Sequence, residues 1–317
     1  MSTDKREVLR LIKIAFNAEV GIPNNIRLPR DIEFVISGNN VEMKLLSDAA
    51  ESNMQEDKAA FEGWALALKR YAKFDNVVLS WQRKRFDKKD NRNGHYQRFL
   101  FRVDNFSWDF KSWFSVKPSC LPYLKNLAID DASTYYLNHP SKDRSITIPQ
   151  QKEGILEFKY TFREWAKDLK DKTNAAFLDR QLPVGVFKKK VKEDNSIFTR
   201  GKSAIDIWGI SKNNDLLLFE LKADGNNKIG IITELYFYCC VMQRVQKGQF
   251  KYEKNDVPNL DKIEKTKKIN AYFFAPELHP LIDKRLVGLF KAPLAPKLDF
   301  HYLIFPKGGG TPITQKF

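Results

Sequence analysis

Two short apolar segments joined by a turn constrain the fold of this chain more than any other feature. Residues 204–210 and 216–222 have the composition of β-strands, and residues 211–215 between them are mostly turn formers. Each strand is apolar on both of its faces, a pattern typical of strands in the centre of a covered sheet. The sequence therefore predicts a central antiparallel hairpin within an α/β fold.

Three charged residues interrupt this apolar hairpin. If it folds symmetrically about Asn213, Asp206 lies opposite Glu220, with Cβ atoms about 5 Å apart. Lys222 lies two residues further on and shares the face of Glu220. Opposed like charges destabilise a sheet, and buried charges persist only when paired or metal-bound. Lys222 balances one carboxylate, so we expect a divalent cation to balance the other.

Two alternatives remain open at this point. In the first, Lys222 forms an ordinary buried ion pair with one of the two acids. In the second, a two-residue turn at Asn213 and Asn214 shifts the register by one residue, which sends Asp206 to the opposite face from Glu220.

The pattern Asp206 … Glu220-Leu221-Lys222 resembles the PD-(D/E)XK nuclease superfamily, which has the restriction-endonuclease-like fold. Ile205 stands where that family usually has proline, a residue that is often absent among its members. The resemblance covers residues 151–275 and implies a Mg²⁺-dependent DNA endonuclease acting in restriction, defence or repair. It implies that Mn²⁺ substitutes for Mg²⁺.

The resemblance also assigns roles to the three charged residues. Asp206 and Glu220 become metal ligands, with the Leu221 backbone carbonyl as a third, because Mg²⁺ is usually held by one or two carboxylates and several waters. Lys222 would orient or deprotonate the attacking water, or stabilise the phosphate in the transition state.

Many family members add a glutamate from the helix before the strands. Glu164 and Glu157 are the candidates here, and Glu164 ranks first because it falls in the middle of the predicted helix. Some relatives carry a glutamine on the second helix, near the position at which this chain has Glu234. A glutamate inside an apolar helix requires a partner, for which Lys222, Lys228 or a metal-bound water is suitable.

The charge balance indicates a polyanionic partner. The chain of 317 residues carries 54 Lys and Arg against 39 Asp and Glu, a formal charge of +15. Neutralisation of phosphates by basic side chains drives nucleic-acid affinity, although a positive charge alone is also compatible with simple solvation. The candidate phosphate contacts are a predicted hairpin tip with Arg83, Lys84 and Arg85, together with Arg180, Lys202 and Lys228.

The element pattern predicts an α/β chain, α+β overall, in two parts. Residues 1–120 form an N-terminal α+β domain for substrate recognition or dimerisation, and residues 121–150 a linker. Residues 151–306 form a restriction-endonuclease-like αβββαβ core with a mixed central sheet, and residues 307–317 a flexible tail. The main predicted elements are helices 154–171 and 229–245, strands 76–82, 96–101, 182–191, 269–274 and 301–305, and the basic hairpin tip 83–94.

Other sequence features narrow the class of protein. Three cysteines fit neither a zinc site nor a disulfide framework, and no apolar run has the length of a membrane span. We therefore expect a cytoplasmic protein without a membrane partner, with a homodimer as one possible assembly. Two alternatives to a DNA nuclease stay open: an RNA nuclease, and a nucleic-acid-binding module or subunit that does not cleave.

Overall fold

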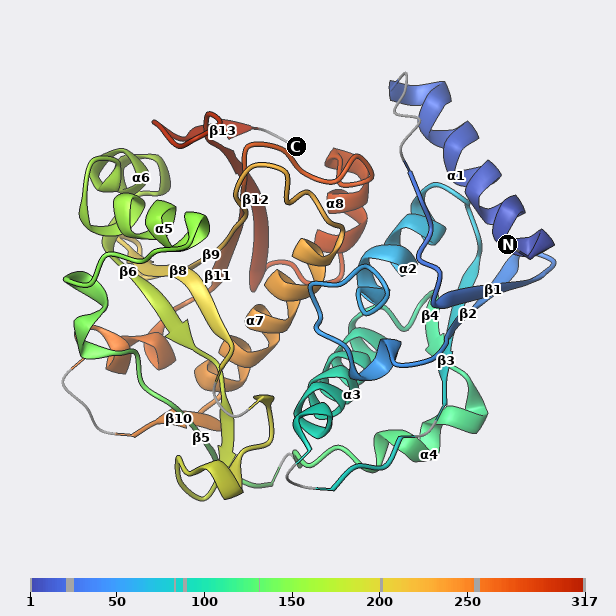
Figure 1. Ribbon diagram of the computed structural model, residues 1–317, viewed down its shortest axis with the longest axis horizontal. Helices are drawn as coiled ribbons and strands as arrows, with labels where there is room; N and C mark the ends of the chain where they lie inside the picture. Colours follow the sequence, from blue (N-terminus) through green and yellow to red (C-terminus); the bar gives the residue numbers. More distant parts are fainter. Residues whose placement is uncertain are drawn as a thin grey trace. The chain divides into compact units, whose positions relative to one another are not determined.

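The computed structural model describes residues 2–20, 26–82, 84–87, 90–130, 132–199, 202–253 and 257–315 (Figure 1). The chain is a mixed α/β protein that divides into two compact units. Unit 1 contains Met1–Ile129, Lys228–Thr233 and His279–Pro293. Unit 2 contains Asp130–Asn227, Glu234–Leu278 and Leu294–Phe317. The division is therefore not a single cut near residue 120, because two later segments also belong to unit 1.

Unit 1 is built on a four-stranded sheet in the order β1-β2-β3-β4. β1 and β2 form an antiparallel hairpin, and β2, β3 and β4 run parallel. The strands are β1 (Ile32–Ser37), β2 (Asn40–Leu45), β3 (Asn76–Trp81) and β4 (Phe114–Val116), and the helices are α1 (Thr3–Val20), α2 (Phe61–Arg70), α3 (Asn91–Asp109), α4 (Leu121–Leu124) and α8 (Lys284–Lys291), with 3₁₀ turns at Ala49–Glu51 and Pro118–Cys120.

A buried ion pair lies inside unit 1. Arg102 on α3 donates to both carboxylate oxygens of Glu62 on α2 at 2.8 and 2.9 Å, and neither side chain is more than 2% exposed. The Thr233 hydroxyl donates to the same carboxylate at 2.9 Å. Glu62 is thus fully engaged within the core of unit 1 and serves a structural role.

Part of the predicted secondary structure in unit 1 is wrong. The predicted strand 96–101 lies inside helix α3, so residues 83–94 are not the tip of a hairpin. The aromatic residues there suggested a strand, but the buried positions recur at helical spacing, as at Tyr96, Phe99, Leu100 and Val103. The Asp90 side chain caps the helix by accepting from the Arg92 amide.

Unit 2 is built on a six-stranded mixed sheet in the order β13-β12-β11-β9-β8-β6. β6, β8 and β9 are antiparallel neighbours, β9, β11 and β12 run parallel, and β13 is antiparallel to β12. The strands are β6 (Ala175–Pro183), β8 (Ala204–Ser211), β9 (Leu216–Leu221), β11 (Ile269–Phe274), β12 (Leu298–Ile304) and β13 (Ile313–Gln315).

Helices lie on both faces of this sheet (Figure 1). Leu156 and Tyr160 of α5 (Lys152–Phe162) and Leu169 of α6 (Ala166–Thr173) belong to one apolar core with residues of β8, β9 and β11. Helix α7 (Gly230–Gln246) follows β9, lies on the opposite face, and belongs to unit 2 from Glu234 onward. The two central strands are therefore covered on both sides, as their composition predicted.

The register of the central hairpin confirms the prediction of symmetry about Asn213. The paired residues run from Ile207 with Phe219 to Ile210 with Leu216. The register shifted by one residue is therefore excluded. The pairing ends at Ile207 with Phe219, and the same register continued by one residue would set Asp206 opposite Glu220.

Two other predictions for this half of the chain require correction. The predicted helix 154–171 is two helices, because Arg163 leaves the helical region and ends α5 at Phe162. The first strand of the core is β6 and not 182–191, which contains the last two residues of β6 and the short β7 (Val186–Lys188). Asp179 and Arg180 inside β6 obscured its apolar pattern.

Parts of the predicted linker and of the predicted flexible tail form strands within the described residues. Within residues 121–150, β5 (Tyr135–Leu137) pairs with β7 and with β10 (Phe250–Tyr252) in a second, three-stranded sheet. In the tail, β13 pairs with β12, and the Tyr160 hydroxyl donates to the Gly310 carbonyl at 2.7 Å. The described residues of unit 2 also form 3₁₀ turns at Lys142–Ser145, Glu193–Asn195 and Leu260–Lys265.

Candidate functional site

The predicted residues Asp206, Glu220 and Lys222 lie together at one edge of the large sheet of unit 2. Asp206 is near the start of β8, and Lys222 directly follows the end of β9. The Asp206 carboxylate accepts a hydrogen bond from the Leu221 amide at 2.8 Å. This contact joins the two strands beyond their last paired residues and fixes Asp206 beside the Glu220-Leu221-Lys222 segment.

Lys222 is held between two buried glutamates. Its Nζ lies 2.5 Å from Oε1 of Glu220 and 2.8 Å from Oε2 of Glu234 on α7. The exposed fraction is 1% for Glu220, 5% for Lys222 and 0% for Glu234. Lys222 is therefore the partner of Glu234, as one of the sequence alternatives proposed, and it also pairs with Glu220.

One oxygen of Glu220 is left without a hydrogen bond. Its Oε2 atom is buried and has no hydrogen-bond partner among the residues that the structure describes. A buried acceptor without a partner carries a desolvation cost, so a native structure is expected to supply a water or an ion there.

The electrostatics of this cluster are dominated by burial and by crowding of carboxylates. Burial raises the pKa of Asp206 well above its ordinary value, and the charge of Glu157 raises it further. Burial likewise raises the pKa of Glu220, helped by Asp206 and Glu234. Burial alone would lower the pKa of Lys222, but Glu220, Glu234 and Asp206 together outweigh burial and raise it. The cluster thus holds an ammonium among carboxylates that resist ionisation.

Of the two candidate glutamates on the first helix, Glu157 is the one near the cluster. Glu157 is 3% exposed, accepts from Gln181 Nε2 at 2.7 Å, and lies 3.5 Å from the guanidinium of Arg180. Burial raises its pKa, and Gln181 and Arg180 oppose that shift.

The ranking of Glu164 above Glu157 was wrong. Glu164 lies beyond the end of α5, its side chain is 58% exposed, and it is 3.7 Å from Lys159. The unforeseen end of the helix at Phe162 explains the error, because Glu164 is not in the middle of a helix.

Glu153, in the first turn of α5, is a residue of this region that the sequence did not suggest. Its carboxylate accepts from the Ala223 amide at 3.3 Å and from Asn226 Nδ2 at 3.0 Å. Ala223 directly follows Lys222, so Glu153 fastens the end of β9 to α5. The available signal was its spacing of four residues from Glu157, which places both acids on one side of the helix.

The cluster offers a metal the carboxylates of Asp206 and Glu220 as candidate donors. Among the described residues, no group of three or more His, Cys, Asp or Glu side chains is arranged to hold a metal ion. Asp206 and Glu220 nevertheless fit a hard cation that keeps several waters, as Mg²⁺ commonly does. The unpartnered Oε2 of Glu220 is the observation that favours this fit.

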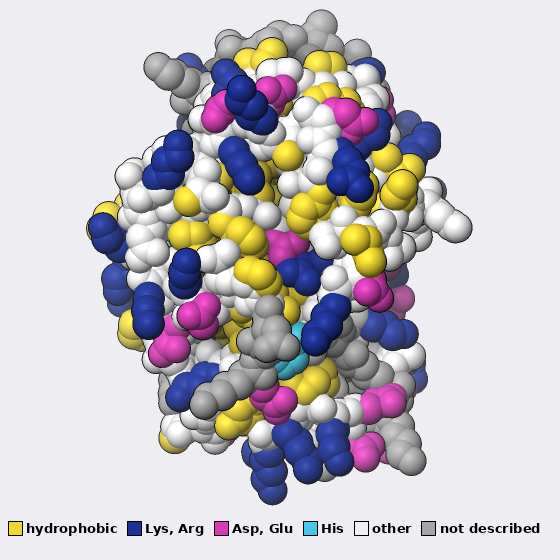
Figure 2. Space-filling model, turned by 90° about the vertical axis from the view of Figure 1, so that its left-hand side faces the viewer, with side chains coloured by type: hydrophobic (Ala, Val, Ile, Leu, Met, Phe, Trp, Pro, Cys, Tyr) yellow, Lys and Arg dark blue, Asp and Glu magenta, His cyan; other side chains and the backbone are white. Residues whose placement is uncertain are grey.

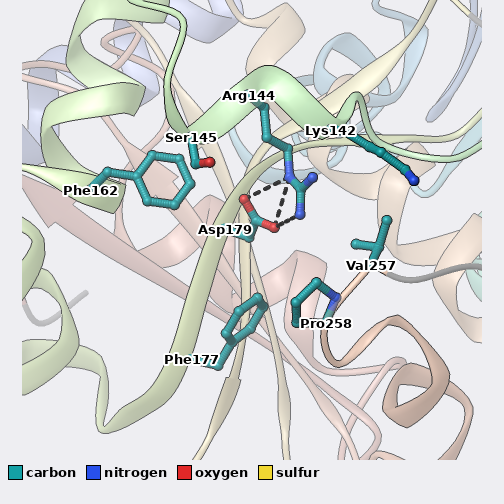
Figure 3. Close-up of a pocket in the computed structure, with 8 residues that line it drawn as sticks. All are labelled: Lys142, Arg144, Ser145, Phe162, Phe177, Asp179, Val257 and Pro258. Atoms are coloured by element: carbon teal, nitrogen blue, oxygen red, sulfur yellow. Dashed lines mark hydrogen bonds and ion pairs between the residues drawn. The ribbon is translucent and has the colours of Figure 1, made fainter.

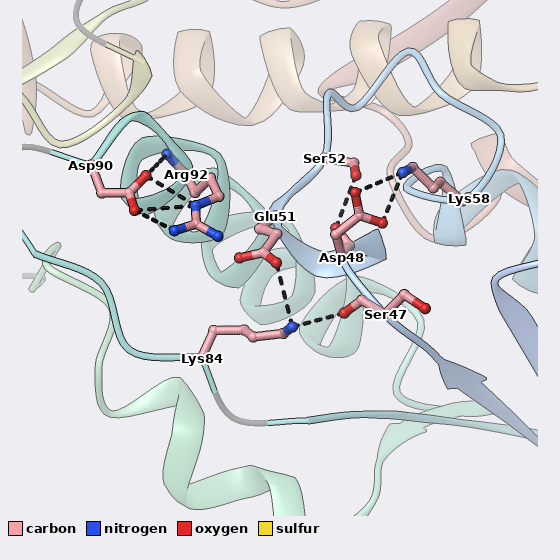
Figure 4. Close-up of polar contacts among 8 residues, drawn as sticks. All are labelled: Ser47, Asp48, Glu51, Ser52, Lys58, Lys84, Asp90 and Arg92. Atoms are coloured by element: carbon pink, nitrogen blue, oxygen red, sulfur yellow. Dashed lines mark hydrogen bonds and ion pairs between the residues drawn. The ribbon is translucent and has the colours of Figure 1, made fainter.

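The predicted basic hairpin tip is engaged in structural contacts where the structure describes it. Lys84 donates to the Ser47 carbonyl at 2.8 Å and to Glu51 at 3.3 Å, which holds its ammonium within unit 1 (Figure 4). Arg85 is exposed, and Arg83 lies outside the described residues. Lys84 is thus a structural cation, and its assignment as a phosphate contact is not supported.

The other predicted phosphate contacts differ in their surroundings. Arg180 is 8% exposed, and its guanidinium is directed at Glu157 and the Gly154 carbonyl, so it positions α5 and is not available to a phosphate. Lys202 in unit 2 and Lys228 in unit 1 are both exposed.

One cavity, of about 360 Å³, does not include the residues of the charged cluster. It is lined by Phe162, by Phe177 and Asp179 of β6, and by a segment containing Arg144, whose guanidinium faces the Asp179 carboxylate at 2.8 and 2.9 Å (Figure 3). A second cavity, about 240 Å³, is lined by Ala223 and Asp224 just after Lys222, and by Lys152 and Lys159 of α5. Two lining residues of the second cavity, Ala223 and Asp224, thus directly follow Lys222 of the charged cluster in the chain.

Within the described part of the chain, no helix combines the length and the apolar composition needed to cross a bilayer. Comparison of the chain with protein-family models, with curated proteins and with solved structures gave no match. The functional assignment therefore depends on the chemistry of the site itself.

Proposed function

We propose that this chain is a Mg²⁺-dependent endonuclease that hydrolyses phosphodiester bonds of DNA. The observation that carries the proposal is the convergence of Asp206, Glu220 and Lys222 at one edge of the sheet, from adjacent strands in the register that the sequence predicted. Perturbed, buried titratable groups that gather in this way are more frequent at functional sites than in ordinary cores.

The order of elements supports membership of the PD-(D/E)XK superfamily. α5 is followed by the antiparallel strands β6, β8 and β9, then by α7, and then by β11, which is parallel to β9. This αβββαβ order, with the acids on the two middle strands, is the one that the resemblance implies. The three-residue signature and the topology are independent features that agree.

The metal would be held by Asp206 and Glu220, with the Leu221 carbonyl and water completing its coordination. When bound, a divalent ion supplies an activated water and relieves the negative charge that develops on the phosphate. Mn²⁺ is expected to substitute for Mg²⁺, since both accept carboxylate and water oxygens. The cluster sets the three carboxylates of Asp206, Glu220 and Glu234 around the single ammonium of Lys222, and a cation would neutralise the surplus of negative charge.

Lys222 is assigned to orient the attacking water and to donate to the phosphate oxygens. Its pKa is raised in the metal-free site, so it is a poor base there and a good hydrogen-bond donor. Glu234 positions Lys222 by holding its ammonium from the side of α7. Glu157 contributes a third carboxylate near Asp206, in the position at which relatives carry a glutamate from the first helix.

Cleavage assays with purified protein test this proposal. Supercoiled plasmid, linear duplex DNA and single-stranded RNA are incubated separately with Mg²⁺, with Mn²⁺ and with a chelator. The proposal predicts metal-dependent cleavage of DNA that is lost in Asp206→Asn and Lys222→Met and retained in Glu164→Gln. Cleavage that is unchanged in Asp206→Asn and Lys222→Met would reject the site, and cleavage of RNA alone would reject the substrate.

A binding module that does not cleave is the second candidate. The observation that favours it is that Lys222 already satisfies carboxylates on both sides, while no group of three ligating side chains is arranged for a metal among the described residues. This candidate predicts retention of DNA that depends on salt and not on Mg²⁺, with no cleavage by the wild-type protein in the same assay.

A further inference from the structure

An extended excursion of the chain leaves the large sheet at the same edge as the charged cluster. β6 ends at Pro183 and β8 begins at Ala204, and these two residues are partners in the sheet. Residues 184–203, here called the basic arm, connect them. Asp206 is three residues past the end of the arm, about 10 Å along an extended strand.

The basic arm is anchored on its inner side by apolar packing. Val184, Val186 and Phe198 are fully buried, and the Phe198 ring lies 5.6 Å from that of Phe237 on α7. At its base, the Val184 amide donates to the Ser203 carbonyl at 2.9 Å. β7 within the arm pairs with β5, which ties the arm to the three-stranded sheet. The described part of the arm, residues 184–199 and 202–203, is therefore anchored to the rest of unit 2.

The outer side of the basic arm presents lysines. Lys188, Lys189, Lys190, Lys192 and Lys202 are all exposed. No ion pair joins any of these five to an acidic side chain of the described residues, although Glu193 and Asp194 lie on the same arm. Most other exposed positive charge is dispersed, whereas here four lysines fall within five residues.

The backbone that carries these lysines is ordered by its own hydrogen bonds. The Lys190 amide donates to the Lys188 carbonyl at 2.9 Å, and Asn195 Nδ2 donates to the Lys190 carbonyl at 3.2 Å. Lys189 is in the left-handed region with φ of 70°, a conformation that a non-glycine residue adopts at some cost. The turn thus holds several ammonium groups together instead of letting the chain spread them.

Exposed cations without an acidic partner among the described residues, on the connection that leads into the strand of Asp206, suit a polynucleotide backbone. The arm lies at the lower end of unit 2 in Figure 1, and Lys and Arg side chains gather at the lower end of the face drawn in Figure 2. We propose that the basic arm binds the phosphates of duplex DNA that flank the bond to be cut. This inference rests on the proposed function for its choice of partner, but its test uses binding without metal.

The test measures binding of a fluorescent duplex of about 20 base pairs by the full chain in the presence of a chelator, over a range of salt concentrations. The arm variant carries Lys188→Gln, Lys190→Gln and Lys192→Gln. The matched control carries Lys262→Gln, Lys265→Gln and Lys267→Gln. These three exposed lysines lie at the opposite end of the hairpin, where the Lys267 amide donates to the Asn214 carbonyl.

Each lost phosphate contact lowers the slope of log affinity against log salt by about 0.9. For the arm variant, the magnitude of this slope is expected to fall by about 2–3 relative to the wild-type protein, and binding at low salt should be weaker. The control, which has the same change in charge, should keep nearly the wild-type slope. A variant with Lys188→Arg, Lys190→Arg and Lys192→Arg keeps the positive charge and should show the wild-type slope. If it does, the effect of the glutamine variant is due to the lost charge and not to a change in folding.

The basic-arm proposal and the nuclease proposal can be contradicted independently of each other. Equal slopes for the arm variant and the control would overturn the arm as a DNA contact, as would a wild-type protein that does not bind the duplex. If the slope falls as expected but Mg²⁺ produces no cleavage, the arm stands and the nuclease proposal fails. If DNA is cleaved but the slopes are equal, the nuclease proposal stands and the arm fails.

Discussion

At the scale of single residues, the charged cluster carries more negative charge than the protein neutralises. Lys222 is shared by Glu220 and Glu234, and Asp206 and Glu157 add further carboxylates nearby. A cluster of this kind is expected to oppose folding in the absence of a cation, because burial and like charges both disfavour ionised carboxylates. The resulting decrease in the free energy of unfolding can be measured by replacing one of the carboxylates.

Replacing Glu220 by Gln should therefore stabilise the metal-free protein. The pKa of Glu220 is raised in the fold, so its contribution to stability is complete below the ordinary value of 4.5 and is lost as pH rises through the raised pKa. At pH 8 we expect Glu220→Gln to raise the free energy of unfolding by about 1 kcal/mol, with a smaller gain at pH 5. Urea unfolding with a chelator present measures this difference.

Glu164→Gln provides the control for that measurement, because it removes one exposed carboxylate of the same type. Its effect should be close to zero at both pH values. A Glu220→Gln protein that is less stable than Glu164→Gln at pH 8 would show that Glu220 is an ordinary structural partner of Lys222.

Binding of Mn²⁺ should separate the ligands from their neighbours. A saturating ligand stabilises the fold by about 2.7 kcal/mol at a hundred times its dissociation constant. We expect Mn²⁺ to raise the melting temperature of the wild-type protein and of Glu164→Gln, but not that of Asp206→Asn. Glu157→Gln should show a reduced shift, since its carboxylate influences Asp206. An equal shift in Asp206→Asn and the wild-type protein would place the metal elsewhere.

At the scale of elements, the apolar pattern predicted the central hairpin correctly and the helices around it less well. The register about Asn213 followed from turn residues and from a side-chain alternation that both strands share, so local information was sufficient. The end of α5 at Phe162 was missed because residues 163–165 include no glycine or proline. Residues 96–101 of helix α3 were predicted as a strand because their aromatic side chains have high β-propensity, and tertiary packing overrode that preference.

The tail illustrates how long-range contacts escape prediction from sequence. Gly308, Gly309 and Gly310 indicated a mobile end, but all three adopt positive φ angles that lead the chain back to β13. A Cβ atom at Gly309 would lie 2.1 Å from the Trp165 ring, so the tail is packed closely against the segment between α5 and α6. Nothing local in the sequence indicates this contact.

Gly309→Ala should therefore disrupt the attachment of the tail. We expect it to destabilise unit 2 by about 1–3 kcal/mol, since the new methyl group must displace a tryptophan ring. Gly308→Ala is the matched control: its φ of 84° also disfavours alanine, but no atom lies within 4 Å of the added Cβ. Limited proteolysis should release the tail sooner in Gly309→Ala than in Gly308→Ala, and equal rates would contradict the packing described.

At the scale of the whole molecule, the two units are not consecutive in sequence, which explains why a single boundary could not be predicted. Lys228–Thr233 belong to unit 1, and the Thr233 hydroxyl donates a hydrogen bond to the Glu62 carboxylate that also pairs with Arg102. Along the sequence, the chain leaves unit 2 after Asn227 and returns to it at Glu234. The candidate site was found from sequence because its three residues lie within one hairpin, whereas Glu153 and Glu157 depend on a helix more than 40 residues away.

Arg102→Met should destabilise unit 1 strongly, because it leaves the Glu62 carboxylate buried without its cation. Removal of one partner from a buried ion pair typically costs about 3–5 kcal/mol. The double variant Arg102→Met with Glu62→Gln should recover part of that loss, since no buried charge remains. Chemical unfolding followed by tryptophan fluorescence measures both, and a double variant less stable than Arg102→Met alone would contradict the prediction.

The measurement that tests the central claim most directly is the location of a metal ion in crystals of the protein soaked in Mn²⁺. We predict an anomalous density peak within about 2.0–2.5 Å of carboxylate oxygens of both Asp206 and Glu220, with Lys222 nearby. Crystals that show no such peak, or a peak at other side chains while Lys222 still bridges Glu220 and Glu234, would contradict it.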